Sequence, residues 1–236
     1  MGPLFHSWLF ATGQLKHAVF APLSAVEEAL GNSRPIKESE VHFQLSIPVE
    51  DREWALARRQ ELGWSQRRIV AISPGSVQPH KQWPGTNFIE LCRKLCEVSD
   101  ISIAVIGTAD SRSLAESMKA GFEDRVTNLC GETTIQRLAA WLELCTMTVG
   151  NDGGSMHVAA GVGCPAVAIM PGIEYPGSIE PWGYQAFSVR HQVPCAPCYS
   201  FMHCPLGHNR CIVEIRVEDV LAKCMSLLYH ADLRST

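Results

Sequence analysis

The sequence of 236 residues lacks any long hydrophobic run. Glycine and proline interrupt its most apolar stretches, such as 162–170, which fall well short of the roughly 20 residues that a membrane span needs. It also lacks an excess of basic residues, since 20 Lys and Arg face 24 Asp and Glu and the net charge is −4. A nucleic-acid-binding protein normally carries a basic face. We therefore expect neither a membrane-spanning segment nor a nucleic-acid partner.

The first residues lack the pattern of a secretory signal peptide, in which a basic segment precedes a long apolar run and a small-residue cleavage site. Internal repeats and low-complexity segments are absent from the sequence as well. Its 46% hydrophobic and 19% charged residues are typical of a globular protein with one large α/β domain, or one domain and part of a second. We expect a cytoplasmic location.

Cysteine, by contrast, is frequent, with ten residues in the chain. A chain of this size does not need disulfides to stabilise its core. Some of the cysteines lie in core-like α/β segments, where we interpret them as buried thiols. They are Cys92, Cys96, Cys130, Cys145, Cys164 and Cys224.

The remaining four cysteines are clustered as Cys195-x2-Cys198-x5-Cys204-x6-Cys211, with three histidines interleaved. A CxxC pair followed by two further cysteines is typical of a zinc or iron–sulfur ligand set. The spacing matches no common zinc module. The prediction of a metal site therefore stands beside an alternative, in which these residues are reduced thiols or form a disulfide.

From about residue 65 the sequence alternates strand-like runs with segments of helical periodicity. Runs of β-branched and apolar residues predict strands at 68–72, 101–106, 127–129, 147–150 and 166–170. Apolar residues spaced three or four apart predict helices at 87–98, 111–120 and 134–144, and a further helix opens at 155–160. Repeated units of this kind build a parallel sheet covered on both faces. We predict an α/β, Rossmann-like, doubly wound domain over 65–236.

The N-terminal quarter of the chain follows a different pattern. A charged amphipathic helix is predicted over 50–62, and the preceding forty or so residues show no strand–helix alternation. We interpret 1–64 as a linker or as a short remnant of another domain.

The loops that follow strands are where binding residues are sought, because ligands of such sheets bind beyond the carboxyl ends of the strands. The segment Ser73-Pro74-Gly75-Ser76 follows the first strand and leads to Lys81. Gly75 permits close backbone approach, serine hydroxyls can donate to phosphate oxygens, and Lys81 can neutralise a diphosphate. The alternative is an ordinary turn with a solvated lysine.

A second loop contains Asp152, Gly153 and Gly154 and ends with His157 in the first turn of a helix. The glycines leave backbone N–H groups bare, and the helix N-terminus adds partial positive charge, so that a phosphate is favoured there. Asp152 can accept hydrogen bonds from sugar or ribose hydroxyls, or cap backbone amides. His157 faces the same ligand or is a structural histidine. In a third loop, Asp110 offers a carboxylate for a ribose or adenine, or caps the following helix.

Taken in chain order, these segments resemble glycosyltransferase family nine, the heptosyltransferase family of lipopolysaccharide core assembly. The resemblance covers roughly 65–230. The matching segments are Ser73-Pro74-Gly75-Ser76, Lys81-Gln82-Trp83-Pro84 with Phe88, Ile106-Gly107 with Asp110, residues 128–135, residues 150–160, and Gly163-Cys164-Pro165.

The resemblance implies a GT-B architecture of two Rossmann-like domains, in which the C-terminal one binds an ADP-sugar and the N-terminal one the acceptor. This chain would supply the C-terminal half. The implied reaction is transfer of heptose from ADP-heptose to a lipopolysaccharide core acceptor, at the inner face of the inner membrane with at most peripheral membrane contact. The implied donor contacts are Ser73, Ser76 and Lys81 to the diphosphate, Asp110 and Thr134 to the nucleotide, and Asp152, Gly153, Gly154 and His157 to the diphosphate and sugar.

The sequence departs from the family in three places. Glu132 stands where the family often has Lys, and Gly154-Ser155 where Gly-Pro is common. Residues 1–64 show no counterpart of the family's Gly-rich acceptor loop or of its general base, so the catalytic residues are unknown. We expect a truncated transferase that binds ADP-heptose and transfers poorly or not at all. The alternatives are a catalytically silent nucleotide-sugar-binding module and a metal-binding structural domain.

Overall fold

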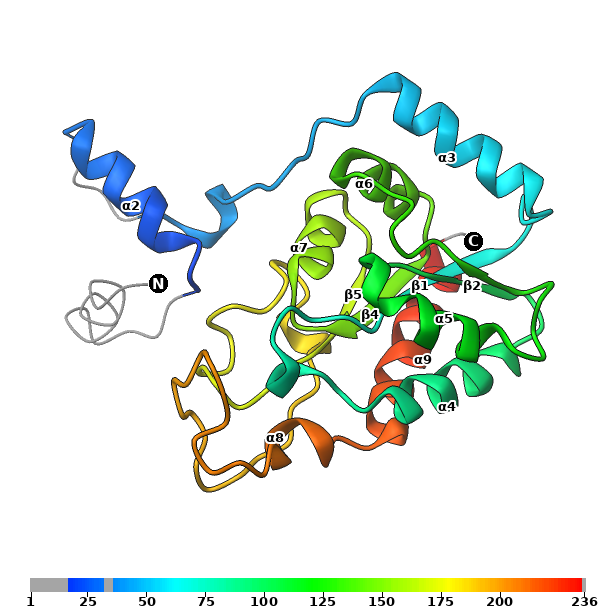
Figure 1. Ribbon diagram of the computed structural model, residues 1–236. Helices are drawn as coiled ribbons and strands as arrows, with labels where there is room; N and C mark the ends of the chain where they lie inside the picture. The colour runs from blue at the N-terminus through cyan, green and yellow to red at the C-terminus, as the bar shows by residue number, and fades with distance from the viewer. Residues whose placement is uncertain (1–16, 32–35, 235–236) are drawn as a thin grey trace.

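The computed structural model describes residues 17–31 and 36–234. Its centre is a five-stranded sheet in the order β3-β2-β1-β4-β5, in which every pair of neighbouring strands is parallel (Figure 1). The strands are β1 Arg68–Ser73, β2 Ile101–Val105, β3 Val126–Asn128, β4 Met147–Asn151 and β5 Ala166–Ile169. The chain moves outward from β1 through β2 to β3, then returns to the other side of β1. The predicted doubly wound α/β sheet is confirmed, with its switch point between β1 and β4.

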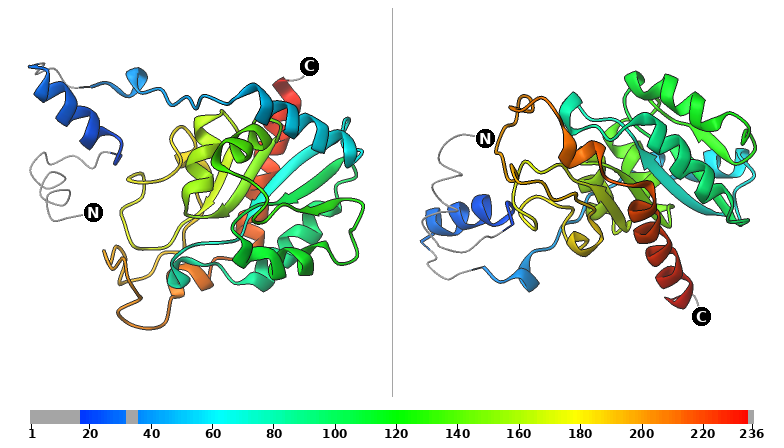
Figure 2. Two further views of the ribbon diagram at one scale, coloured as in Figure 1. Left: turned by 45° about the horizontal axis from the view of Figure 1, so that its top comes forward. Right: turned by 90° about the horizontal axis from the view of Figure 1, so that it is seen from below.

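Helices cover both faces of this sheet, as Figures 1 and 2 show. One face carries α4 Gly85–Cys96, α5 Arg112–Lys119 and α9 Val217–Arg234, and the other carries α3 Val49–Glu61, α6 Ile135–Glu143 and α7 Gly154–Gly161. The side chains of β1 alternate between the two cores, since Val70 and Ile72 pack on the first face and Ile69 and Ala71 on the second. All four are fully buried. A short helix, α8 Arg210–Val213, precedes α9.

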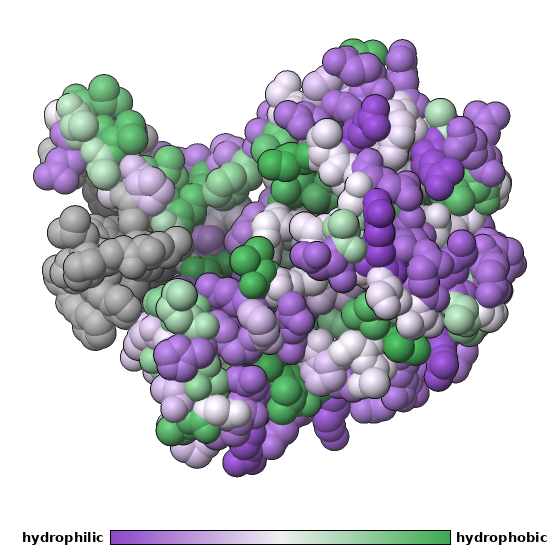
Figure 3. Space-filling view, viewed as in Figure 1, coloured by the Kyte–Doolittle hydropathy of each residue, from purple (hydrophilic) through white to green (hydrophobic). Residues whose placement is uncertain are grey.

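The segment before the sheet contains α2 Phe20–Ala29, the 3-10 turn Glu38–Glu40 and an extended stretch that leads into α3. In Figures 1 and 2, α2 stands away from the sheet domain. The apolar side chains of Val26 and Leu30 are 56% and 69% exposed, and Figure 3 shows apolar atoms on this helix. No sequence pattern predicted α2. The predicted helix over 50–62 is confirmed as α3, which packs against α6 through Trp54 and Trp141.

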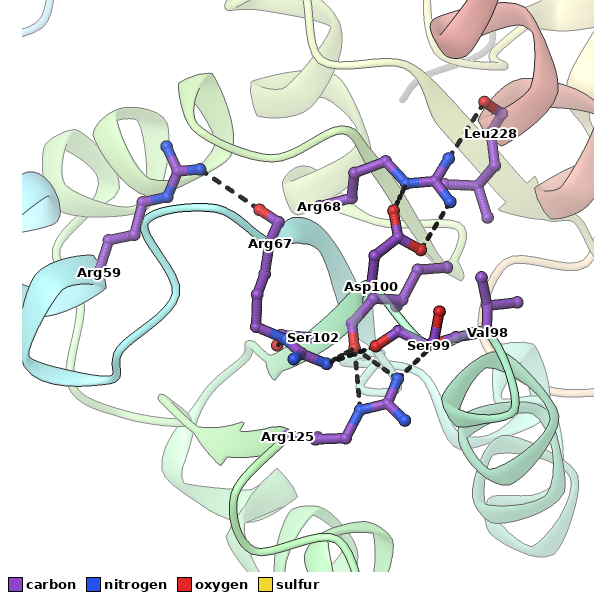
Figure 4. A network of polar contacts seen from close by, with 10 residues as sticks. Arg59, Arg67, Arg68, Val98, Ser99, Asp100, Ser102, Arg125 and Leu228 are labelled. Carbon is purple, nitrogen blue, oxygen red and sulfur yellow. Dashed lines mark hydrogen bonds and ion pairs between the residues drawn. The ribbon is translucent and has the colours of Figure 1, made fainter.

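A network of arginines stabilises the end of the sheet where β1, β2 and β3 begin (Figure 4). The guanidinium of Arg125 donates to the carbonyls of Cys96, Val98 and Ile101, which satisfies the backbone at the end of α4. Arg68 binds the Asp100 carboxylate through two hydrogen bonds of 2.6 and 2.9 Å. These contacts lie at the opposite end of the sheet from the loops that carry the predicted binding residues, and we interpret them as structural.

The six cysteines predicted to be buried are 0 to 8% exposed, which confirms that prediction. Among the described residues, no helix is long and apolar enough to cross a membrane.

Candidate functional site

The loops after β1 and β4 meet at the switch point of the sheet. Ser73, the last residue of β1, is in register with Gly150 of β4. The Ser73 hydroxyl lies 2.7 Å from the hydroxyl of Ser155 in α7. A Cβ atom at Gly150 would lie only 2.2 Å from the backbone oxygen of Ser73, so the close approach of the two strands requires glycine.

The buried side chain of Asn151 connects these loops. Its Nδ2 donates to the carbonyl of Pro74 over 2.6 Å, and its Oδ1 accepts from the backbone N–H of Trp83 over 3.0 Å. Trp83, in turn, donates its indole N–H to the carbonyl of Ile215. Asn151 therefore holds both ends of the segment that carries Lys81. Sequence reasoning missed this role, although an amide at the end of a buried strand is a signal that a polar partner must be present.

Lys81 and Asp152 form an ion pair at the centre of the site. Their Nζ and Oδ2 atoms are 3.0 Å apart, and their side chains are only 15% and 9% exposed. The backbone N–H of Asp152 donates to the carbonyl of Ile169 at the end of β5. The structure thus brings together two predicted residues that are 71 positions apart in the sequence.

The N-terminus of α7 opens beside this pair. Gly153 occupies the N-cap position without a capping side chain, and a Cβ at Gly154 would meet no atom within 4 Å. The Met156 N–H donates to the carbonyl of Gly153, and no side chain caps the start of the helix, so the N–H groups of Gly154 and Ser155 are the ones that could bind an anion there. His157 lies in the first turn and keeps part of its surface exposed. Partial burial lowers its pKa, the charge of Asp152 opposes this shift, and His17 adds to it.

Asp110 and Thr134 lie farther along the same edge, beyond β2 and β3. Both side chains are exposed. Thr134 is the N-cap of α6, where its hydroxyl accepts from the backbone N–H of Arg137 over 3.2 Å. A Cβ at Gly131 would lie 3.2 Å from Ala109, so the two loops are in contact. The predicted residues therefore form two groups on one edge of the sheet. The first lies around Lys81 and Asp152 and includes Ser76, which is half-buried after β1, and the second consists of Asp110 and Thr134.

Three charged residues of the loop after β5 were missed by sequence reasoning. The Arg190 guanidinium holds the Glu180 carboxylate by hydrogen bonds of 3.0 and 2.8 Å, and it also donates to the carbonyls of Pro171 and Glu174. Burial opposes ionisation of Glu180, but the Gly177 N–H and Arg190 outweigh it and lower the pKa. No sequence motif predicts the role of these three residues, because their binding partners are brought together only by tertiary contacts.

A segment near the N-terminus also contacts this loop. The backbone N–H of Ala18 donates to the carbonyl of Ser178, and the ring of His17 is hydrogen-bonded to the carbonyl of Glu180. His17 packs edge-on against Trp182, with ring centroids 5.0 Å apart. Since His17 acts on the pKa of His157, this segment borders the site.

The clustered cysteines lie between β5 and α9, three of them in a loop and Cys211 in α8. Cys195 Sγ is 3.9 Å from His208 Nε2. Burial opposes ionisation of Cys204, but backbone N–H groups of residues 206–209 donate to its sulfur and lower its pKa. Burial raises the pKa of Cys211, and the other three thiols add to this shift. Within residues 17–31 and 36–234, no three or more His, Cys, Asp or Glu side chains are grouped to hold a metal ion. The arrangement does not fit a ligand set, and the metal site stays a prediction.

Comparisons with known proteins show the family to which the chain belongs. Residues 2–208 match the model of glycosyltransferase family 9 (heptosyltransferase). The chain is 26% identical over 222 residues to lipooligosaccharide heptosyltransferase 2 of Campylobacter jejuni, covering 92% of this chain and 66% of that protein. It thus spans slightly less than two thirds of this curated relative.

Two solved structures share its fold. The family 9 glycosyl transferase of Veillonella parvula has a TM-score of 0.73 and 22% identity, covering 92% of this chain and 61% of that chain. The ADP-heptose LPS heptosyltransferase II of E. coli has a TM-score of 0.63 and 23% identity, covering 80% of this chain and 54% of that chain.

Proposed function

We propose that this chain, which belongs to glycosyltransferase family 9, binds the ADP-linked sugar donor of a heptosyltransferase at the carboxyl ends of β1 and β4. The observation that carries the proposal is the partly buried pair of Lys81 and Asp152 beside the uncapped N-terminus of α7. A cation and free helical N–H groups attract a diphosphate, while a carboxylate accepts hydrogen bonds from sugar hydroxyls.

The two groups of site residues suit the two halves of a nucleotide-sugar. The diphosphate would be held by the Lys81 ammonium, the Ser73 and Ser76 hydroxyls, and the N–H groups at Gly153 and Gly154. Asp152 and His157 would contact the sugar, because they flank the start of α7 and the N–H of Asp152 is bonded to the end of β5. Asp110 and Thr134, exposed beyond β2 and β3, would contact the nucleoside.

The donor would be ADP-heptose, because the E. coli relative with the same fold is described as an ADP-heptose enzyme. We further propose that residues 65–236 form the donor-binding domain, together with α3, which packs on α6. The rest of 1–64 would link this domain to the region that binds the acceptor. The acceptor would be a lipopolysaccharide core sugar at the cytoplasmic face of the inner membrane. The location of the general base in an acceptor domain stays a prediction.

Calorimetric titration of the full chain with ADP-heptose, ADP, a UDP-sugar and a GDP-sugar tests the proposal. We expect one site that prefers the ADP-sugar. Lys81→Ala should weaken binding by about 1.5–3 kcal/mol, roughly 10- to 150-fold, because a charge-assisted contact to phosphate is lost. Lys94→Ala is the matched control, since Lys94 lies on α4 and pairs with Glu90 over 3.6 Å.

Absence of nucleotide binding by the folded chain would refute the proposal. Incubation with ADP-heptose and a heptose-deficient lipopolysaccharide then separates a working transferase from a silent binding module. Heptose transfer by the 236-residue chain would contradict the expectation of weak or absent activity.

A further inference from the structure

We propose that Glu174 is an additional residue of the donor site, whose carboxyl group in its neutral form donates a hydrogen bond to an oxygen of the bound sugar diphosphate. This inference rests on the donor binding proposed above. It adds a residue that neither the family resemblance nor the motifs of the sequence singled out.

The backbone at Glu174 is held from two sides. Arg190 Nη1 donates to the carbonyls of Pro171 and Glu174, over 2.8 and 3.2 Å. The N–H of Tyr199 donates to the carbonyl of Ile173 over 2.9 Å. Because the main chain is fixed on both sides of this residue, the side chain has a defined direction, and its conformation is not that of a mobile surface glutamate.

The Glu174 side chain is buried and incompletely bonded. It is 9% exposed, and its Oε2 atom is buried without a hydrogen-bond partner among the described residues. A buried polar atom left without a partner costs about 1–3 kcal/mol, so proteins seldom leave one in place unless a ligand or water bonds it. The loop that carries this carboxyl group starts at the end of β5, where the carbonyl of Ile169 accepts from the N–H of Asp152. The charges of Lys81 and Asp152 both act on the Glu174 carboxyl group.

The two cations that act on Glu174 among the described residues both have other partners. Lys81 is paired with Asp152, and Arg190 is bonded to Glu180 and to backbone carbonyls. Burial raises the pKa of Glu174, and the negative charges of Asp152 and Glu180 act in the same direction, while Lys81 and Arg190 oppose the shift.

A diphosphate bound to Lys81 would bring further negative charge to this carboxyl group. It would favour the neutral form still more, and a neutral carboxyl group can donate to a phosphate oxygen that a carboxylate would repel. Binding is therefore coupled to proton uptake. The affinity for the donor should be lowest above the pKa that Glu174 has in the complex. It should rise as the pH falls to the pKa that Glu174 has in the free protein, and it should stay constant at lower pH. An ADP-sugar diphosphate is esterified at both ends and gains no proton in this range.

The test is calorimetric titration of the full chain with ADP-heptose between pH 5.5 and 8.5, in buffers of different ionisation enthalpy so that protons are counted. Glu174→Gln keeps a neutral hydrogen-bond donor. At the acidic end of this pH range we expect it to bind within about threefold of the wild type, with the proton uptake due to this residue lost. Glu174→Ala should lose at least about tenfold in affinity, as expected for a hydrogen bond to a charged group.

Three control variants isolate the effect. Glu97→Gln changes an exposed glutamate at the C-terminal end of α4 and should leave both affinity and proton uptake unchanged. Three histidines near the site, His17, His80 and His157, also titrate within this pH range. The proton uptake of Glu174 is therefore the part that is lost in Glu174→Gln, and that part should persist in His157→Gln and in His80→Gln. Circular dichroism of each variant confirms that it is folded.

Each outcome is decisive. Unchanged affinity in Glu174→Ala, unchanged proton uptake in Glu174→Gln, or equal losses in both variants would overturn the inference while donor binding by the wild type stands. Absence of ADP-heptose binding by the wild type would overturn the proposed function and this inference with it.

Discussion

Asn151→Ala is the substitution that most sharply tests how the site is held together. It removes the partners of two buried backbone groups, the carbonyl of Pro74 and the N–H of Trp83. Each unsatisfied group costs about 1–3 kcal/mol, so we expect a loss of about 2–6 kcal/mol in the free energy of unfolding. For a domain of this size a loss of about 3 kcal/mol lowers Tm by about 6–12 °C.

Asn151→Asp separates the two hydrogen bonds. The carboxylate can still accept from Trp83 N–H, but it places a negative oxygen against the Pro74 carbonyl, where the amide donated over 2.6 Å. At neutral pH this variant should be at least as unstable as Asn151→Ala. At a pH low enough to protonate the new carboxyl group, it should recover part of the loss relative to the wild type, since a protonated group can donate.

Urea unfolding followed by circular dichroism measures these differences, and the coincidence of fluorescence and circular dichroism transitions checks that unfolding is two-state. Asn87→Ala is the control, because Asn87 lies in α4 and its side chain makes no hydrogen bond among those found in the described residues. We expect it to change stability by less than about 0.5 kcal/mol. A cost below about 0.5 kcal/mol for Asn151→Ala would refute the reasoning that Asn151 anchors the Lys81 segment.

Further predictions concern the acidic loop, the thiols and the strand contact. Folding lowers the pKa of Glu180. The ionised Glu180 carboxylate therefore stabilises the fold above its unfolded-state pKa of about 4.3, and this stabilisation is lost as the pH falls through the lower folded-state pKa. Glu180→Gln should therefore flatten the acid limb of a stability profile, and an unchanged limb would exclude this origin. A thiol reagent should label the native, reduced protein rapidly only at the half-buried cysteines, and all ten after unfolding. Slower labelling of the half-buried set in the reduced protein would indicate a bound metal. The rapidly labelled set is Cys195, Cys198, Cys204 and Cys211. Gly150→Ala should lower stability by about 1–3 kcal/mol or more through the clash with Ser73, and a Tm within 1 °C of the wild type would contradict that contact.

The sheet could be predicted because its strands are buried on both sides and therefore appear as continuous apolar runs. The predicted strand at 147–150 differs from β4 by one residue, and the predicted helix over 87–98 begins two residues after α4 does. Such differences are usual at element ends, where capping and not periodicity decides. The helix α2 was not predicted because its apolar side chains do not form a buried stripe, as the exposed Val26 and the exposed Leu30 that follows the helix show.

The site could be predicted only where a local pattern carries the chemistry. Glycines before a helix indicate an anion site in any chain, and Lys81 lies in the loop that follows a strand. That Lys81 pairs with Asp152 depends on β4 returning beside β1, which no local pattern encodes. Glu174 and Arg190 were missed for the same reason, since their partners are set by the folded loop after β5.

A crystal structure of the chain with ADP-heptose is the most direct test of the central claim. The account predicts the diphosphate at the N-terminus of α7, with Lys81 Nζ and an oxygen of Glu174 within hydrogen-bond distance of it. A cavity of about 400 Å³ lies away from this site, between residues 42–47 and the end of α7, and is lined also by Arg52 and Glu143. A diphosphate bound there, or anywhere away from Lys81, would contradict the account.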